Sequence, residues 1–167
     1  IREMADQVTL KEFGLDHALA KEWKATSSPT ILFDPDRFRI RWLGAPVGEE
    51  GKTFVAVLQM MGYRSTELSQ DSRKVLEKIR EPRAIKIFVS PTCPYCPSAV
   101  VLAHRMALES PYITADMVEA MEFPELAERF AVSGVPQTTI NQGAGTLVGA
   151  VPEDNLIAEI KAVLEKA

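Results

Sequence analysis

The chain has 167 residues, of which 46% are hydrophobic and 25% are charged, a composition typical of a globular protein with a sizeable core and not of a disordered one. Nineteen Lys and Arg stand against 23 Asp and Glu, for a net charge of -4 without a dense basic run, which argues against nucleic acid as a partner. The longest apolar stretches, around 54–58 and 99–103, are far shorter than the roughly 20 residues that cross a bilayer, so no membrane span is expected.

The two cysteines of the chain, Cys93 and Cys96, lie three positions apart. A pair this close cannot connect distant segments, so it is not the framework of a disulfide-stapled secreted protein. We therefore expect the pair to act chemically.

The first residues, Ile1 to Met4, show neither an initiator methionine at the start nor the charged and then apolar pattern of a secretory signal. We interpret them as a cut end.

From residue 65 onward the elements can be predicted in chain order. Ser69 and Ser72 form a helix start, and apolar residues follow at helical spacing, so residues 65–79 are expected to form a helical connector. Residues 85–89 alternate and are rich in β-branched side chains, which predicts a strand. The apolar run 98–108 then predicts a buried helix.

The rest of the chain continues this alternation of strands and helices. The predicted elements are a strand at 112–115, a helix at 123–130, a hairpin of 137–141 with 146–151, and a final amphipathic helix at 152–164. For residues 85–167 the order is strand, helix, strand, helix, strand, strand, helix, with the cysteine pair at the first strand-to-helix junction. This order predicts an α/β protein with the thioredoxin fold.

An internal repeat extends this fold to the first part of the chain. Residues 19–29 align without gaps with residues 126–136, and the glycine and proline of 44–46 correspond to those of 149–152, with a hairpin two residues longer in the first copy. A chance match of hydrophobic positions is the alternative, and the shared prolines and glycines argue against it. When the offset between the copies is subtracted from the positions of Cys93 and Cys96, the equivalent positions lie upstream of residue 1. The first copy is therefore expected to lack its opening strand, its opening helix and any matching cysteines.

The predicted architecture is therefore a tandem of thioredoxin-like units. Residues 1–64 are expected to form a partial unit without cysteines, and residues 65–82 a helical connector. Residues 83–167 are expected to form a complete unit that carries Cys93 and Cys96.

The chemistry expected of Cys93 and Cys96 is thiol–disulfide exchange. Their spacing places both in the first turn of a helix, where the partial positive charge of the helix N-terminus favours a thiolate. Cys93 should face solvent and attack a substrate disulfide, and Cys96 should resolve the mixed disulfide. Pro94 and Pro97 lie where a missing N–H costs little, so they fix the geometry of the site.

Zinc is the alternative use of a Cys-x-x-Cys pair. The chain has no second cysteine pair, and only His17 and His104 could complete a site, so neither a metal nor another cofactor is expected. His104 follows Cys96 by about two helical turns in an apolar helix, which favours a hydrogen-bonded packing residue over a proton shuttle. The aromatic and methionine residues recur at core-facing spacings and are interpreted as packing.

Four further motifs point to one family. They are Pro91-Thr92-Cys93-Pro94-Tyr95-Cys96-Pro97, Phe123-Pro124-Glu125-Leu126-Ala127, Val135-Pro136 and Gly44-Ala45-Pro46-Val47-Gly48-Glu49. Together they resemble the glutaredoxin-like protein disulfide oxidoreductase family with tandem thioredoxin folds. The resemblance implies a cytoplasmic enzyme that reduces, oxidises or shuffles the disulfides of protein substrates, with a thioredoxin-reductase-like or other thiol electron donor as its partner.

The resemblance also implies which residues contact the substrate. In this fold the peptide that corresponds to Val135-Pro136 is cis and faces the cysteine pair, so Tyr95, Val135 and Pro136 are expected to bind substrate. Ser28-Pro29 is the matching peptide of the first copy. For Val135-Pro136, the alternative is an ordinary turn proline without a role in binding.

Two other functions stay open at this point. One is an electron-relay domain similar to the N-terminal part of the alkyl hydroperoxide reductase flavoprotein, which passes electrons to a peroxiredoxin. The other is a non-enzymatic glutaredoxin-like module that binds an iron–sulfur cluster. Glutaredoxins share the Cys-Pro-Tyr-Cys sequence, but the glycines and aspartates with which they hold glutathione are not reproduced at 149–154, which favours protein substrates. The sequence leaves the direction of electron flow open.

Overall fold

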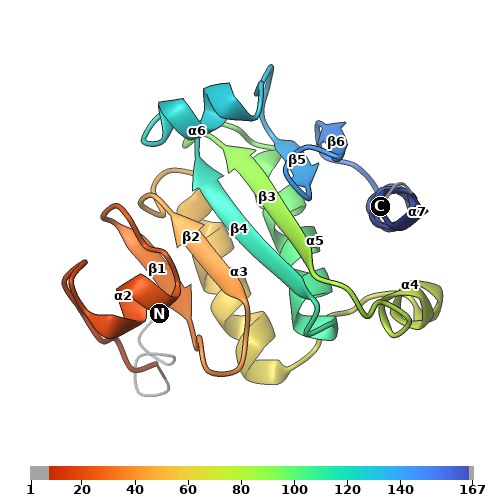
Figure 1. Cartoon of the computed structure of the whole chain (residues 1–167), viewed down its shortest axis with the longest axis horizontal. Coiled ribbons are helices and arrows are strands. Elements are labelled where there is room, and N and C mark those ends of the chain that lie inside the picture. Colours follow the sequence, from red (N-terminus) through yellow and green to blue (C-terminus); the bar gives the residue numbers. More distant parts are fainter. Residues whose placement is uncertain (1–7, 166–167) are drawn as a thin grey trace.

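The computed structural model describes residues 8–165 and contains one six-stranded sheet (Figure 1). The strands are β1 (Thr30–Phe33), β2 (Ile40–Leu43), β3 (Arg83–Val89), β4 (Ile113–Glu119), β5 (Gln137–Ile140) and β6 (Gly145–Val148). The helices are α2 (Ala18–Glu22), α3 (Glu50–Tyr63), α4 (Gln70–Leu76), α5 (Cys96–Glu109), α6 (Pro124–Arg129) and α7 (Glu153–Glu165). Across the sheet the strands lie in the order β1-β2-β4-β3-β5-β6. The features predicted for residues 1–4 lie outside the described residues.

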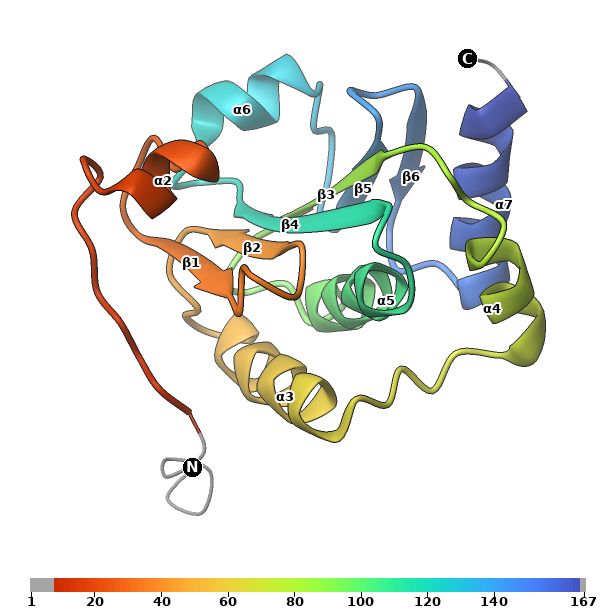
Figure 2. The ribbon, with the colours of Figure 1, turned by 60° about the horizontal axis from the view of Figure 1, so that its bottom comes forward.

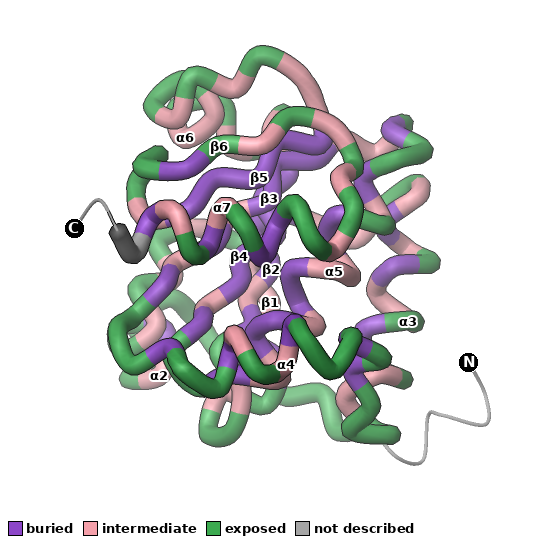
Figure 3. Tube along the Cα trace, turned by 90° about the vertical axis from the view of Figure 1, so that its right-hand side faces the viewer, coloured by how far each residue is buried: buried purple, intermediate pink, exposed green. Residues whose placement is uncertain are grey.

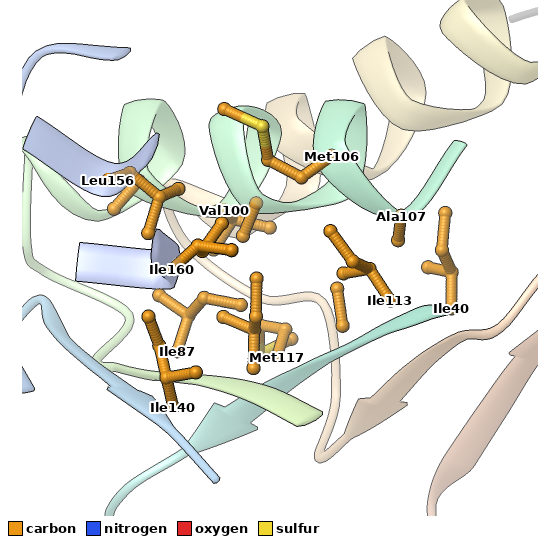
Figure 4. Close-up of a cluster of buried hydrophobic side chains, with 14 of the residues drawn as sticks. Ile40, Ile87, Val100, Met106, Ala107, Ile113, Met117, Ile140, Leu156 and Ile160 are labelled. Atoms are coloured by element: carbon orange, nitrogen blue, oxygen red, sulfur yellow. The ribbon is translucent and has the colours of Figure 1, made fainter. Parts of the chain in front are cut away.

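Helices cover both faces of the sheet (Figure 2). On one face α3 and α5 pack over the strands, and α7 adds Leu156 and Ile160 to a core that also contains Val100 of α5 and Ile87 of β3 (Figure 4). On the other face α6 packs over a smaller core that includes Phe88. The middle strands β3, β4 and β5 are therefore mostly buried on both faces (Figure 3).

The second unit has the element order that the sequence predicts. Strands β3 and β4 are parallel, β5 and β6 form an antiparallel hairpin, and α5, α6 and α7 follow at the expected places. Strand β4 is longer than the predicted 112–115, because it continues through Asp116 to Glu119. A carboxylate can lie inside this strand because Arg41 Nη2 lies 2.6 Å from Asp116 Oδ2 and Lys86 pairs with the same oxygen.

The internal repeat is present in the backbone. Strands β1 and β2 correspond to β5 and β6, with a hairpin two residues longer in the first copy, as predicted. Ser28-Pro29 and Val135-Pro136 are both cis. The N–H groups of Gly44 and Gly149 donate to the carbonyls of Pro29 (3.0 Å) and Pro136 (2.7 Å). Within the described residues the fold is thus a thioredoxin-like tandem, with a partial N-terminal unit that lacks an opening strand and helix and a complete C-terminal unit.

The two units are joined through the sheet itself. β2 of the first unit pairs in parallel with β4 of the second. Behind this seam Trp42 Nε1 donates a hydrogen bond to His104 Nε2 at 2.8 Å, and both side chains are fully buried. The predicted helix start between the units is confirmed, because the Ser69 side chain accepts from the N–H of Ser72 at 3.1 Å. The division at residues 64 and 82 stays a prediction, since the strands of both units form one continuous sheet.

The helices in the described part of the chain are all too short or too polar to cross a membrane.

Candidate active site

Cys93 and Cys96 lie at the junction of β3 and α5. This junction is at the edge of the sheet where the parallel strands β2, β4 and β3 end (Figure 1). The two cysteines form a disulfide, with Cα atoms 5.5 Å apart. The junction is the predicted one, but α5 begins at Cys96, so Cys93 lies in the turn before the helix and not in its first turn. The N–H of Cys93 donates to the carbonyl of Ser90 at 3.2 Å and holds this turn. Pro97 occupies one of the first positions of the helix, where its missing N–H leaves no intrahelical bond unmade.

The two cysteines differ in their burial. Cys96 is completely buried, whereas Cys93 keeps 7% of its surface exposed. The expectation that Cys93 faces solvent is therefore wrong in degree, because the surrounding loops cover most of this residue. Of the two, Cys93 is nevertheless the one that an incoming sulfur can reach.

The local electrostatics also distinguish the two sulfurs. The backbone N–H of Cys96 donates to Cys93 Sγ at 3.1 Å. This N–H belongs to the N-terminus of α5, and the first turn of α5 has no acidic residue. When the disulfide is reduced, such a donor and the helix dipole stabilise negative charge on the sulfur of Cys93. The arrangement can therefore support a nucleophilic thiolate at Cys93.

The cis peptide Val135-Pro136 reaches the same edge of the sheet. It directly precedes β5, which runs antiparallel to β3 with Gln137 opposite Phe88. It therefore lies beside the loop that carries Cys93. Val135 is half-buried and Pro136 is buried, whereas Tyr95, within the cysteine loop, is 68% exposed. The topology thus brings the three expected substrate-contacting residues to one edge, and their role in binding belongs to the proposal below.

The first unit also contributes to the cysteine loop. The N–H of Glu49 donates to the carbonyl of Pro91 at 3.0 Å. Gly48 has a φ of +61°, and a Cβ at this position would collide with the Pro91 carbonyl oxygen. Glycine meets both requirements, because it tolerates positive φ and allows close backbone approach. As a result, the start of α3 is fixed against the loop that leads to Cys93.

Glu50, the first residue of α3, is a buried carboxyl group beside this contact. The residue is 1% exposed, and neither of its carboxylate oxygens has a hydrogen-bond partner in the described structure. Burial raises the pKa of Glu50 from 4.5 to about 7. Thr53, one turn further along α3, lines a groove together with Pro97 and Ser98 of α5, so the first turns of the two helices face each other. A carboxyl group with this pKa can accept and return a proton near neutral pH.

Sequence reasoning missed Glu50 because a glutamate in the first turn of a helix is ordinary there, where the helix dipole favours it. Its burial depends on segments that are distant in the sequence, and no local signal marks it.

The assignment of His104 as a packing residue is confirmed. Its imidazole is fully buried and accepts the hydrogen bond from Trp42 Nε1. Burial lowers the pKa of His104 from 6.5 to about 4, so the ring is neutral at neutral pH. Among the described residues, no group of three or more His, Cys, Asp and Glu side chains is arranged to hold a metal ion.

A thioredoxin-like fold with a disulfide at its first strand-to-helix junction defines a thiol–disulfide oxidoreductase. Comparison with known proteins agrees, since a sequence profile described as "Thioredoxin domain" matches residues 83–162. The chain is 33% identical over 78 residues to a thioredoxin of Methanocaldococcus jannaschii, covering 46% of this chain and 91% of that protein. It is 32% identical over 77 residues to a probable thioredoxin of Archaeoglobus fulgidus, covering 46% of this chain and 82% of that protein.

Two solved structures extend the similarity to the first unit. A protein disulfide oxidoreductase from Aeropyrum pernix superimposes with a TM-score of 0.82 at 30% identity, covering 91% of this chain and 67% of that one. The NTD N/C domain of alkylhydroperoxide reductase AhpF from Enterococcus faecalis also gives a TM-score of 0.82, at 27% identity, covering 93% of this chain and 77% of that one. The chain belongs to the protein disulfide oxidoreductase family with tandem thioredoxin-like units.

Proposed function

We propose that this enzyme exchanges disulfides with protein substrates, with Cys93 as the nucleophile and Cys96 as the resolving residue. The hydrogen bond from the Cys96 N–H to Cys93 Sγ carries the proposal, because it favours a thiolate at the more accessible sulfur. The Cys93 thiolate attacks one sulfur of the substrate disulfide. A Cys93–substrate bond forms while the substrate S–S bond breaks, and the released substrate thiolate takes up a proton.

Cys96 completes the cycle. In our proposal the Cys96 thiol gives its proton to Glu50, and the Cys96 thiolate attacks Cys93 Sγ. The second substrate thiolate then leaves, and two electrons have passed from the dithiol to the substrate. The same steps in reverse oxidise a substrate dithiol. The buried position of Glu50 at the start of α3, with its pKa near 7, supports its role as the proton acceptor.

The proposal includes the contacts and partners of the enzyme. Tyr95, Val135 and Pro136 contact the substrate segment that carries the reacting disulfide, and their shared position at the cysteine edge supports this. A thioredoxin-reductase-like or other thiol donor restores the dithiol after each reduction. We propose a cytoplasmic location, as the family resemblance implies, and a cycle without a further cofactor.

Reduction of insulin by dithiothreitol tests the proposal. The wild type should accelerate the reaction, and Cys93→Ser should not, because the attacking sulfur is gone. In a separate incubation with insulin after the dithiothreitol has been removed, Cys96→Ser should still attack and should accumulate a mixed disulfide that non-reducing electrophoresis detects. Full activity of Cys93→Ser, or no trapped partner with Cys96→Ser, would contradict the assigned roles.

A relay between a reductase and a peroxiredoxin is a second candidate, supported by the similarity to the alkylhydroperoxide reductase domain over both units. In that case a flavin-containing reductase domain should reduce the Cys93–Cys96 disulfide, and the dithiol should then reduce a peroxiredoxin. Peroxide-dependent oxidation of NADH in a mixture of the three proteins measures this relay. Efficient insulin reduction without any peroxide turnover would favour the first function.

A further inference from the structure

Five loops lie side by side at the edge of the sheet that carries Cys93 and Cys96, in an order that follows the strand order. We call these five loops the row. Because β2, β4 and β3 are parallel, residues 44–49, 120–123 and 90–95 follow their carboxyl ends at one edge. β5 is antiparallel to β3 and β6 to β5, so residues 130–136 and 149–152 reach the same edge. With neighbouring strands about 4.8 Å apart, the row from β2 to β6 spans about 19 Å, the length of an extended segment of about six residues.

Exposed apolar side chains gather on this row. Ten large hydrophobic residues are exposed in the described part of the chain, and four of them lie here: Val47 (48%), Tyr95 (68%), Met121 (76%) and Val148 (56%), the last residue of β6. Val47 belongs to the first unit and lies close to the cysteine loop, because the two residues after it approach Pro91. Apolar residues gathered around a redox disulfide are typical of a surface that binds another protein.

The charges on the row are acidic and lie on its first-unit side. The five loops contain two charged residues, Glu49 after β2 and Glu122 after β4. Glu122 Oε1 accepts from the N–H of Ala45 at 2.8 Å and so connects the two loops. Lys52 Nζ lies 3.7 Å from Glu49 Oε2, but both groups are well exposed, and such a pair neutralises little of the local potential. This side of the row therefore attracts cations.

We propose that the row binds an extended segment of the protein substrate in which the reacting cysteine has apolar neighbours and a cationic residue one to three positions away. The inference rests on the proposed function, because the segment is held for attack by Cys93. Glu122 lies in the loop one strand away from β3, and Glu49 in the loop two strands away. At the usual strand spacing these loops are about 5 and 10 Å from the cysteine loop, and an extended chain covers these distances in one to three residues. The first unit thus supplies one side of the binding surface through Val47 and Glu49.

Short peptides with one cysteine, linked by a disulfide to mercaptoethanol, test this inference. One peptide carries Arg two residues before the cysteine, a second carries it two residues after, and a third has Ser at both positions. For the wild type, kcat/KM should be about two- to fivefold higher for one of the Arg peptides than for the Ser peptide, the range of a partly exposed charge pair. The ratio should approach one in E49Q/E122Q, because both charges are lost while the amide oxygen introduced at position 122 can still accept from the N–H of Ala45.

The control is Asp71→Asn, which removes the same charge from a side chain that is 93% exposed on α4. It should keep the wild-type preference. Val47→Ser should raise KM more than it lowers kcat, because it removes uniform binding and no transition-state contact. A wild-type ratio of one for both Arg peptides, or an unchanged ratio in E49Q/E122Q, overturns the inference. If the wild type reduces none of the peptides, the proposed function itself fails.

Discussion

Replacing Glu50 by Gln should raise the stability of the folded protein at alkaline pH and leave it almost unchanged at acid pH. The folded state holds the proton of this carboxyl group more tightly than the unfolded chain, since burial raises its pKa from 4.5 to about 7. Below pH 4.5 the group is protonated in both states, so it imposes no penalty on folding. Above pH 4.5 it ionises more readily in the unfolded chain, and this lowers the free energy of unfolding. The penalty grows as the pH rises from 4.5 to 7 and is constant above that range. Its full size is about 3.5 kcal/mol, at about 1.4 kcal/mol for each pH unit between the two pKa values, and nearly all of it develops between pH 4 and pH 8.

Urea unfolding of the wild type and Glu50→Gln, with the disulfide intact and the ionic strength constant, measures this effect between pH 4 and 8. The amide of Gln is as poorly partnered as the protonated carboxyl group, so the offset that it adds is small and does not depend on pH. The difference between the two proteins should change by about 3 kcal/mol from pH 4 to pH 8 in favour of the variant. Glu125→Gln, in the first turn of α6 but exposed, is the matched control and should change by less than about 0.5 kcal/mol. A pH-independent difference for Glu50→Gln would refute the reasoning.

Two other substitutions test the contacts between the units. Gly48→Ala should lower the free energy of unfolding by about 1–3 kcal/mol and slow insulin reduction, because its Cβ would press on the Pro91 carbonyl at a positive φ. Gly62→Ala, a position in α3 with open space around the added Cβ, should be neutral or stabilising by up to about 1 kcal/mol. Asp116→Asn should cost about 3–5 kcal/mol in urea unfolding, because two largely buried cations lose their counter-ion. If Asp116→Asn and the exposed Asp71→Asn lower the free energy of unfolding equally, the buried ion cluster does not stabilise the fold more than an exposed ion pair does.

The pKa of Asp116 shows that a residue of the first unit stabilises a buried charge in the second. Burial alone would raise it, but the hydrogen bond from Arg41 and the charges of Lys86 and Arg41 outweigh burial and keep the pKa below 3.8. Arg41 comes from β2 of the first unit and also donates to the Trp23 carbonyl at 2.6 Å. The ion cluster therefore ties a strand of the complete unit to two segments of the partial one.

The sequence by itself determined the chemistry and the repeat. A cysteine pair at i and i+3 after a predicted strand indicates either thiol–disulfide exchange or metal binding, because these are the two reactions for which proteins use closely spaced thiols. The repeat was readable because prolines and glycines mark backbone conformations: a cis proline is present in each copy, and the positive-φ glycine Gly44 of the first copy corresponds to Gly149 of the second. Element order in the second unit followed from local periodicity, which depends on neighbours in the chain.

The tertiary structure alone decided how the units share one site. The parallel pairing of β2 with β4 uses backbone groups that every residue carries, so no side-chain pattern announces it. Strand β4 was predicted too short because Asp116 interrupts its apolar pattern, and the cations that neutralise it come from neighbouring strands. Glu50 and Cys93 owe their burial to segments that are remote in sequence. Burial sets the pKa and the accessibility of a group, and burial is a property of the packed chain.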